Sequence, residues 1–333
     1  MKKLRQYIGI IALLLVAGAV SSCVKDDYTE SEKGSRVANV TVLIDDSTPL
    51  VTEEAGVNEG IKTLRLIVVN SDNKVEVNYY TDYANNESNE KSIVLLGLSV
   101  GLKSFYVVAN EASVGWTEKD FPSAGAPMPS EFINKIIDDP SRSYFPKLSR
   151  DIGELGLPII GTLLNQEVGN GDNKIEIPIK HAVAKISLSF INHTSSELPI
   201  RSITLGNFLA DQTYSFERPE DFWRSVSYKG YTFYRQQGTT GAVIKPESNN
   251  EDLIKFYVYE TDEDPATYTL SMQVDATGVN TATAVQFLDS KQILQNNWIK
   301  VTATISLSEV NDITLTWKVA DWTGEVIDVP EFN

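Results

Sequence analysis

The chain has 333 residues, with 29 lysine and arginine residues against 45 aspartate and glutamate residues, and a formal net charge of −16. A surface this acidic argues against nucleic acid as a partner and against binding to anionic membranes by charge. The length is sufficient for two domains of ordinary size, each with its own core. The aromatic and β-branched content, with few helical patterns, predicts mostly β structure.

The first 22 residues have the pattern of a secretory signal. Three basic residues near the start precede an apolar stretch from Ile8 to Val20, and small residues follow. The stretch is too short to span a bilayer, which needs about 20 apolar residues. We expect residues 1–22 to be removed and residues 23–36 to form a polar tether.

Cys23, the only cysteine, comes directly after this signal in the segment Val20-Ser21-Ser22-Cys23. The segment resembles a bacterial lipobox, in which the cysteine thiol takes a diacylglycerol and its new amino terminus is acylated. The alternative is an ordinary secreted protein with a free thiol. Each buried methylene of an acyl chain contributes about 0.8 kcal/mol, so a multiply acylated cysteine holds firmly to a membrane. We predict that Cys23 carries the lipid and that the mature chain forms no disulfide.

Lys25-Asp26-Asp27 follows the cysteine. A lysine and two acidic residues at this place resemble the surface-export signal of Bacteroidetes lipoproteins. The resemblance implies a surface-exposed protein anchored to the outer membrane. The alternatives are a solvated tether and a position facing the periplasm.

The first strand is predicted at Val37–Asp45, where Val40, Val42 and Ile44 alternate with more polar positions. These three side chains are expected to be buried in the first sandwich. Residues 46–60 follow as an acidic loop.

Alternation of apolar and polar residues predicts further strands, with turns rich in glycine and asparagine between them. They are a hairpin at Leu64–Tyr80, then Ile93–Leu96, Lys103–Ala109, Pro158–Leu164, Ile175–Ile179, 182–190, Phe256–Glu260, Tyr268–Val274, Ile299–Leu307 and Ile313–Val319. One short helix is predicted at Glu131–Ile137, capped by Ser130. This pattern indicates an all-β chain of two tandem antiparallel β-sandwich domains with few short helices, at residues 37–178 and 179–333.

No constellation of catalytic or metal-binding residues emerges. His181 and His193 have no cysteine or histidine at metal-ligand spacing, and no phosphate-binding glycine loop or Gly-x-Ser-x-Gly motif is present. The acidic run Glu260–Asp264 does not fit a twelve-residue calcium loop and is predicted to be a solvated hairpin end. No pair of carboxylates is singled out for glycoside hydrolysis. We predict no metal, no cofactor and no enzymatic activity.

Four stretches, which span most of the chain from Val37 onward, resemble the fimbrillins of the Bacteroidales (type V) pilus. One is a strand that ends in Ala-Asn, the second opens a second domain, the third reads Phe-Tyr-Val-x-Glu, and the fourth is a closing pair of strands that ends in a tryptophan-bearing segment. They are Gly101–Asn110, Lys180–Ile186, Phe256–Glu260, and Asn297–Ile305 with Trp317–Trp322.

The resemblance implies two transthyretin-like sandwiches and assembly with other fimbrial subunits. In this family a protease cuts shaft precursors after an arginine and removes the first strand, and the open groove takes a terminal strand from a neighbour. Main-chain hydrogen bonds supply affinity in such strand addition, and a head-to-tail contact that does not close builds a filament. Here the candidate donor segment is the apolar carboxyl end, with Val326, Ile327, Val329 and Phe332. The alternative is an edge strand packed on its own domain, ended by Pro330.

The chain departs from the shaft pattern in one place, because residues 46–60 contain no arginine and no lysine. Arg36 precedes the first strand, and a cut there would leave the groove filled. A subunit that keeps its lipid and its first strand occupies an end of the filament, so we predict an anchor or a tip. A shaft subunit matured by another protease is the alternative.

Two other classes of function compete with the fimbrial one. A surface glycan-binding lipoprotein would use Trp116, Trp223 and Tyr231, which lie in stretches predicted to be loops and could stack on sugar rings. A secreted hydrolase has no support beyond size. The sequence identifies no host or bacterial surface ligand.

Overall fold

The computed structural model describes residues 37–45, 60–83, 92–138, 147–148, 152, 155–234, 243–246, 248–274, 285–286, 292–305 and 313–321. Strands dominate this part of the chain, with two short α-helices, α2 (Ser130–Ile133) and α3 (Phe222–Ser225). The predicted all-β sandwich class is confirmed. No helix among these residues is both long and apolar enough to cross a membrane.

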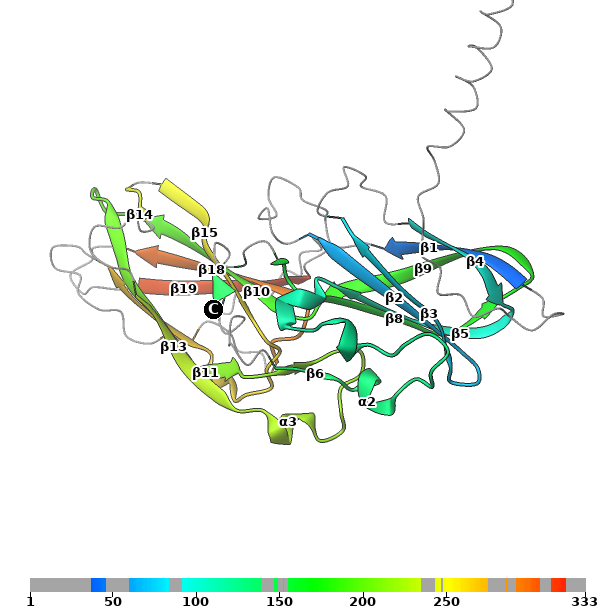
Figure 1. The fold of residues 1–333 in the computed structure, drawn as a ribbon. Helices are drawn as coiled ribbons and strands as arrows, with labels where there is room; N and C mark the ends of the chain where they lie inside the picture. The colour runs from blue at the N-terminus through cyan, green and yellow to red at the C-terminus, as the bar shows by residue number, and fades with distance from the viewer. Residues whose placement is uncertain are drawn as a thin grey trace, which may run out of the picture. The chain divides into compact units, whose positions relative to one another are not determined.

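Seven strands form the first sheet, in the order β3-β2-β5-β8-β9-β1-β4 (Figure 1). Their bounds are β1 Val37–Asp45, β2 Thr63–Asn70, β3 Val75–Asp82, β4 Ser92–Ser99, β5 Gly101–Ala109, β8 Ile159–Val168 and β9 Gly171–His181. The strands β8 and β9 pair only where Ile159–Gly161 meets Ile179–His181. Inward side chains from both parts of the sheet, β3-β2-β5-β8 and β9-β1-β4, share one apolar core. The sheet therefore closes over itself as a sandwich.

Two further sheets build the second half of the chain. One has the order β19-β18-β10-β15-β7 and the other β13-β11-β16-β17, with β14 paired to β11. The bounds are β7 Lys147–Leu148, β10 Ala184–Asn192, β11 Leu198–Ala210, β13 Tyr228–Tyr234, β14 Val243–Ile244, β15 Ser248–Val258, β16 Thr269–Val274, β17 Val285–Gln286, β18 Asn297–Ile305 and β19 Ile313–Asp321. A two-stranded sheet joins β6 (Ile136–Ile137) to β12 (Thr213–Tyr214).

Two strand pairs run parallel, whereas purely antiparallel sandwiches were predicted. The strand β1 pairs parallel with β9, and β10 pairs parallel with β18. In each case the opening strand of a sandwich meets a strand from near its end, so a long stretch of chain separates the two. Parallel neighbours need such a long connection, whereas a tight turn can join only antiparallel ones.

The predicted helix at Glu131–Ile137 is shorter than expected. The helix α2 ends at Ile133, its cap position is Pro129, and no side chain caps it. Ile136 and Ile137 instead pair with β12, and Ile137 is buried. A four-residue helix has little stability of its own, so pairing with a distant strand decides the conformation of the last residues.

Contacts across the predicted domain boundary are extensive. The boundary between residues 178 and 179 falls inside β9, and β7, which precedes it, pairs with Phe256 and Tyr257 of β15. One apolar cluster includes Ile67 and Tyr106 from the first sheet together with Ile186 and Phe256 from the second half. The strand β2 is consequently buried on both faces, with Leu64, Leu66 and Val68 in the first core and Ile67 and Val69 in this second cluster.

Candidate functional site: the first strand and its groove

The first strand, β1, lies between two other strands. It pairs antiparallel with β4, from Val37 opposite Ser99 to Leu43 opposite Ser92, with a bulge at Ala38 and Asn39. On its other side it pairs parallel with β9, from Ala38 opposite Gly171 to Asp45 opposite Pro178. Figure 1 shows β1 between these two strands. Both hydrogen-bonding edges of β1 are therefore occupied.

The side chains of β1 alternate strictly between core and surface. Val40 and Val42 are fully buried, Ala38 and Ile44 nearly so, and Val37 is 46% exposed. Val42 lies opposite Ile93 of β4 and Ile175 of β9, both of which are buried. Each buried valine or isoleucine contributes roughly 1.5–3 kcal/mol relative to exposure.

A groove would be left by removal of β1. The inward side chains of β4 and β9 would lose their central neighbour, and both strands would present unpaired N–H and C=O groups. Such edges are templates for pairing with another strand. The groove would accept an extended segment with aliphatic residues at every second position.

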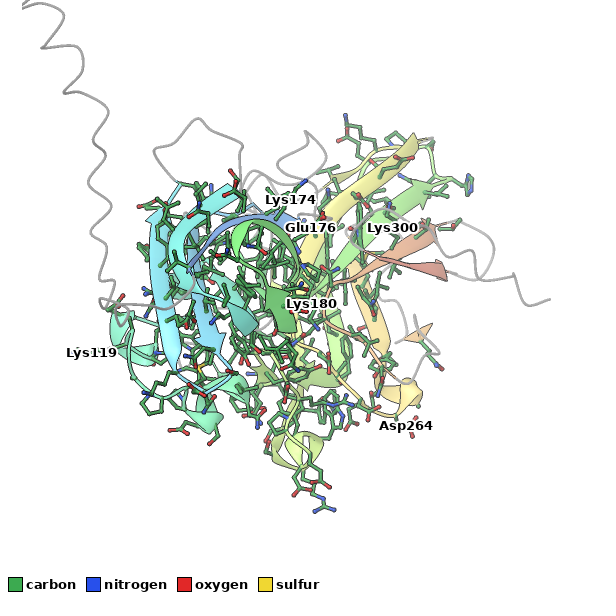
Figure 2. The ribbon with its side chains drawn as sticks, turned by 90° about the vertical axis from the view of Figure 1, so that its right-hand side faces the viewer. Lys119, Lys174, Glu176, Lys180, Asp264 and Lys300 are labelled. Atoms are coloured by element: carbon green, nitrogen blue, oxygen red, sulfur yellow. The ribbon has the colours of Figure 1, made fainter. Side chains whose placement is uncertain are left out.

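The outward face next to the groove is polar. Lys174, Glu176 and Lys180 follow one another along β9 (Figure 2), and the Nδ2 of Asn39 on β1 donates to the Oδ1 of Asp172 at 3.0 Å. This hydrogen bond is exposed to water. The outer face of β1 therefore adds little to its hold on the domain.

Asn110, the last residue of the Ala-Asn motif, fastens the start of β2. It has a φ of 58°, and its Oδ1 accepts from the backbone N–H of Lys62 at 2.7 Å and of Thr63 at 3.3 Å. Its Nδ2 donates to the carbonyls of Gly60 at 3.0 Å and Leu157 at 2.7 Å. Asparagine tolerates the left-handed conformation better than most residues. This clamp holds the chain at the far end of the loop that follows β1, independently of β1 itself.

Arg65 occupies the second buried face of β2. Its Nε and Nη2 donate to both carboxylate oxygens of Glu111 at 2.7 and 2.9 Å, and Nη2 also meets Glu118 at 2.7 Å. Its Nη1 donates to the Oδ1 of Asn78 at 2.7 Å, and the guanidinium lies 4.3 Å from the centre of the Phe121 ring. A buried cation is tolerated only when paired in this way. The sequence showed Arg65 only as a polar position in the alternation.

Glu260, which closes the Phe-Tyr-Val-x-Glu motif, is buried, so the prediction of a solvated hairpin end is wrong at this residue and at Thr261. Its Oε2 accepts from the backbone N–H of Gln295 at 3.2 Å and from the hydroxyl of Tyr214 at 3.3 Å. Burial raises the pKa of Glu260, opposed by the Gln295 hydrogen bond and by the charges of Lys180 and Arg218. Contacts from β12 and from the turn before β18 cover it, and these are distant in the sequence.

The pKa values of two neighbours of Glu260, Lys180 and Tyr214, are also shifted. Burial lowers the pKa of Lys180, and the Glu260 charge opposes this change. Burial raises the pKa of Tyr214 to about 12, with a further contribution from Glu260. This cluster ties the end of β9 to β12 and β15. Among the residues that the structure describes, no group of three or more histidine, cysteine or acidic side chains is placed to hold a metal.

The three aromatic residues considered for sugar stacking lie on different elements. Trp116 is only 8% exposed and packs edge-on against Phe121 at 5.9 Å, with the Lys135 Nζ 4.9 Å from its ring centre. Trp223 belongs to α3 and Tyr231 to β13, so neither lies in a loop. Little of the Trp116 ring is available to a sugar.

Several predicted site residues lie outside the described residues. They are Cys23, Lys25, Asp26 and Asp27, the nearby Arg36, and the donor segment with Val326, Ile327, Val329 and Phe332. The described part of the chain resumes at Gly60 after β1, so residues 46–59 also lie outside it.

Several solved structures share this fold, although no family model and no curated protein matches the sequence. The tip fimbrial protein Mfa3 from Porphyromonas gingivalis, truncated at its carboxyl end, superimposes with a TM-score of 0.52 at 14% identity over 86% of this chain and 100% of that one. A fimbrilin from the same species gives 0.51 at 13% identity over 88% and 99%. A candidate cell adhesion protein from Bacteroides eggerthii gives 0.54 at 13% identity over 86% and 97%. The chain has the fold of these fimbrial and adhesion proteins, as the resemblance in sequence implied.

Proposed function

We propose that this chain is a structural subunit of a cell-surface fimbria, held in the outer membrane by lipid on Cys23. The fold shared with fimbrial proteins over nearly the whole chain supports this role. The lipobox-like segment and the residues Lys25-Asp26-Asp27 support lipid anchoring and surface display. The protein acts by assembly with other fimbrial subunits rather than by catalysis.

The subunit occupies an end of the filament, as an anchor at the base or as a tip. The observation that carries this proposal is that β1 fills the groove, paired on both edges and buried along one face. Residues 46–60, which follow β1, offer no arginine or lysine to a protease. A filled groove cannot take a donor strand from a neighbour, so growth of the filament stops on that side.

The carboxyl end serves as the donor to the one neighbour that remains. The strand β19 ends at Asp321, and the apolar segment 326–333 follows it. Its removal should leave the melting temperature of the monomer nearly unchanged and abolish attachment to the neighbouring subunit. Unfolding or loss of solubility of the truncated monomer would assign the segment to its own core instead.

The amino terminus of the protein taken from the cell surface tests the end position. We expect a lipidated terminus at Cys23, and a species that starts between residues 46 and 60 would make this a shaft subunit. Cys23→Ala should fail to incorporate labelled fatty acid and should leave the membrane fraction. Alanines at Lys25, Asp26 and Asp27 should keep the lipid but reduce cleavage by protease added to whole cells. Retention of the Cys23→Ala protein in the membrane would contradict the lipid anchor.

A further inference from the structure

The strands β8 and β9 stay together for only three residue pairs and then separate. Their pairing ends at Gly161 opposite Ile179. The next residue on the β9 side is Pro178, which has no N–H to donate, and a Cβ on Gly161 would lie 2.6 Å from the Pro178 carbonyl oxygen. The two backbones are therefore close at Gly161 and diverge beyond it. A hollow of about 230 Å³ lies at this point.

The walls of this hollow are mostly apolar. They include Ile160 of β8, which is buried, and the ring of Phe216, from the segment after β12. The Phe216 ring is only partly buried, and it packs edge-on against Tyr106 with the ring centres 5.0 Å apart. A concave site lined by aliphatic and aromatic side chains, with a few polar groups among them, is the usual form of a small-molecule site.

Two polar side chains also line the hollow, Lys180 and Thr162. Lys180 lies opposite Ile160 in the strand register, and therefore on the same face of the sheet. Among the described residues, Glu260 forms its ion pair with Arg218 at 3.7 Å, and Lys180 forms none, although the charge of Glu260 attracts it from further away. The hydroxyl of Thr162 is buried and has no hydrogen-bond partner in this part of the chain. Burial lowers the pKa of Lys180, so an anion in the hollow would stabilise its charged form.

We propose that this hollow binds a small carboxylic acid with a single aromatic ring, with the ring against Ile160 and Phe216 and the carboxylate beside Lys180. An apolar cavity of about 150 Å³ holds benzene, so the volume here admits one ring and a short arm but not a long acyl chain. An inorganic anion would leave the apolar walls uncovered. A neutral aromatic molecule would leave Lys180 without an ion-pair partner in contact with it.

The proposed site is independent of the proposed fimbrial assembly. None of the described residues that line the hollow belongs to β1 or to the carboxyl-terminal segment 326–333. Loss of ligand binding would therefore leave the fimbrial role intact, and a failure of the fimbrial role would leave the binding site intact.

Fluorine NMR titration of para-fluorophenylacetate into residues 23–333 carrying Cys23→Ser tests the ligand class. We expect saturable binding, at least about tenfold tighter than that of the neutral para-fluorophenylacetamide, because only the acid forms an ion pair with Lys180. Lys180→Met should remove this difference, and the matched control Lys174→Met, at an exposed position of the same strand, should keep it (Figure 2). No saturable binding of the acid, equal binding of acid and amide, or an equal loss in Lys174→Met would overturn the proposal.

Two further measurements test the position and the size of the site. Thr162→Phe should fill the hollow and abolish binding at an unchanged melting temperature. The matched control is Leu164→Phe, because Leu164 is 42% exposed, lies two residues further along β8 and does not line the hollow. Dodecanoate should not displace the fluorinated acid from the chain without these substitutions, because its acyl chain is too long for the hollow. Binding that persists in Thr162→Phe, or displacement by dodecanoate, would contradict the proposed site.

Discussion

The opening strands of the two sandwiches, β1 and β10, have the same partners but different surroundings. Each lies between an antiparallel neighbour, β4 or β15, and a parallel one, β9 or β18. The strand β1 is buried on one face only, whereas five successive residues of β10, Ala184–Leu188, are all buried. The strand β10 continues from β9 through Ala182 and Val183, whereas no described strand precedes β1.

The polar residues of the two strands show how their outer faces differ. On β10, the Ser187 hydroxyl accepts from the Trp298 indole N–H at 2.6 Å, and the Lys185 Nζ lies 4.3 Å from the centre of the same ring. On β1, Asn39 makes one exposed hydrogen bond to Asp172. The equivalent strand of the two sandwiches is therefore packed on both faces in the case of β10 and on one face only in the case of β1. We predict that only the second kind can be exchanged for a strand of similar pattern.

Deletion of residues 37–45 should have the largest effect. The first core loses the buried side chains of Ala38, Val40, Val42 and Ile44, so we expect aggregation of the purified chain. A peptide of residues 37–45 added during refolding should restore a soluble monomer, as measured by light scattering. A peptide with aspartate in place of Val40 and Val42 is the control and should fail. A deleted chain that remains soluble with an unchanged melting temperature would show that β1 is dispensable.

A substitution in β10, tested for rescue by a peptide in the same way, sharpens the comparison. Ile186→Asp should unfold the second sandwich, since an unpaired charge would be buried there. A peptide of residues 184–192 should not rescue it, because the defective strand stays attached at both ends and blocks the site. Rescue by this peptide would mean that both strands are equally exchangeable.

Loss of a single outer-face hydrogen bond should destabilise the chain more on β10 than on β1, and both losses should be smaller than the effects above. Ser187→Ala leaves the Trp298 indole without its acceptor and should cost about 1–2 kcal/mol of unfolding free energy. Asn39→Ala removes an exposed bond and should change stability by less than about 0.5 kcal/mol. Urea unfolding of both variants measures the difference. Equal losses of unfolding free energy in the two variants would contradict the conclusion that β1 is stabilised through one face only.

The dependence of stability on pH that Glu260 contributes should be the smallest effect. Because burial raises its pKa above the ordinary value of 4.5, the folded chain binds more protons than the unfolded chain between these two pKa values. The unfolding free energy contributed by Glu260 therefore falls as the pH rises through that window. Glu260→Gln should flatten this slope, and Glu176→Gln, on the exposed face of β9, should not. An unchanged slope in Glu260→Gln would mean that the carboxyl keeps its ordinary pKa.

Local patterns in the sequence predicted the first strand with its observed bounds, Val37–Asp45, and the hairpin of β2 and β3. Alternation over several residues and turn chemistry depend on neighbouring residues, so they can be recognised without knowing which distant segments pack against them. The strand β11, the longest among the described residues, was not predicted, and Tyr231 of β13 was assigned to a loop. A register shift between Leu205 and Leu209, beside Gly206, interrupts the pattern that would have revealed the pair.

The sequence by itself determined the class of fold, the positions of most strands along the chain and the face of β1 that is buried. Only the tertiary structure decided that β1 and β10 run parallel to β9 and β18, that Arg65 and Glu260 are buried with their partners, and that Ile136 and Ile137 leave the helix. Each of these depends on residues tens of positions away, such as Glu111 for Arg65 and Gln295 for Glu260. Periodicity shows that a side chain is covered but not which distant segment covers it, because the free energy of that contact arises only when the chain has folded.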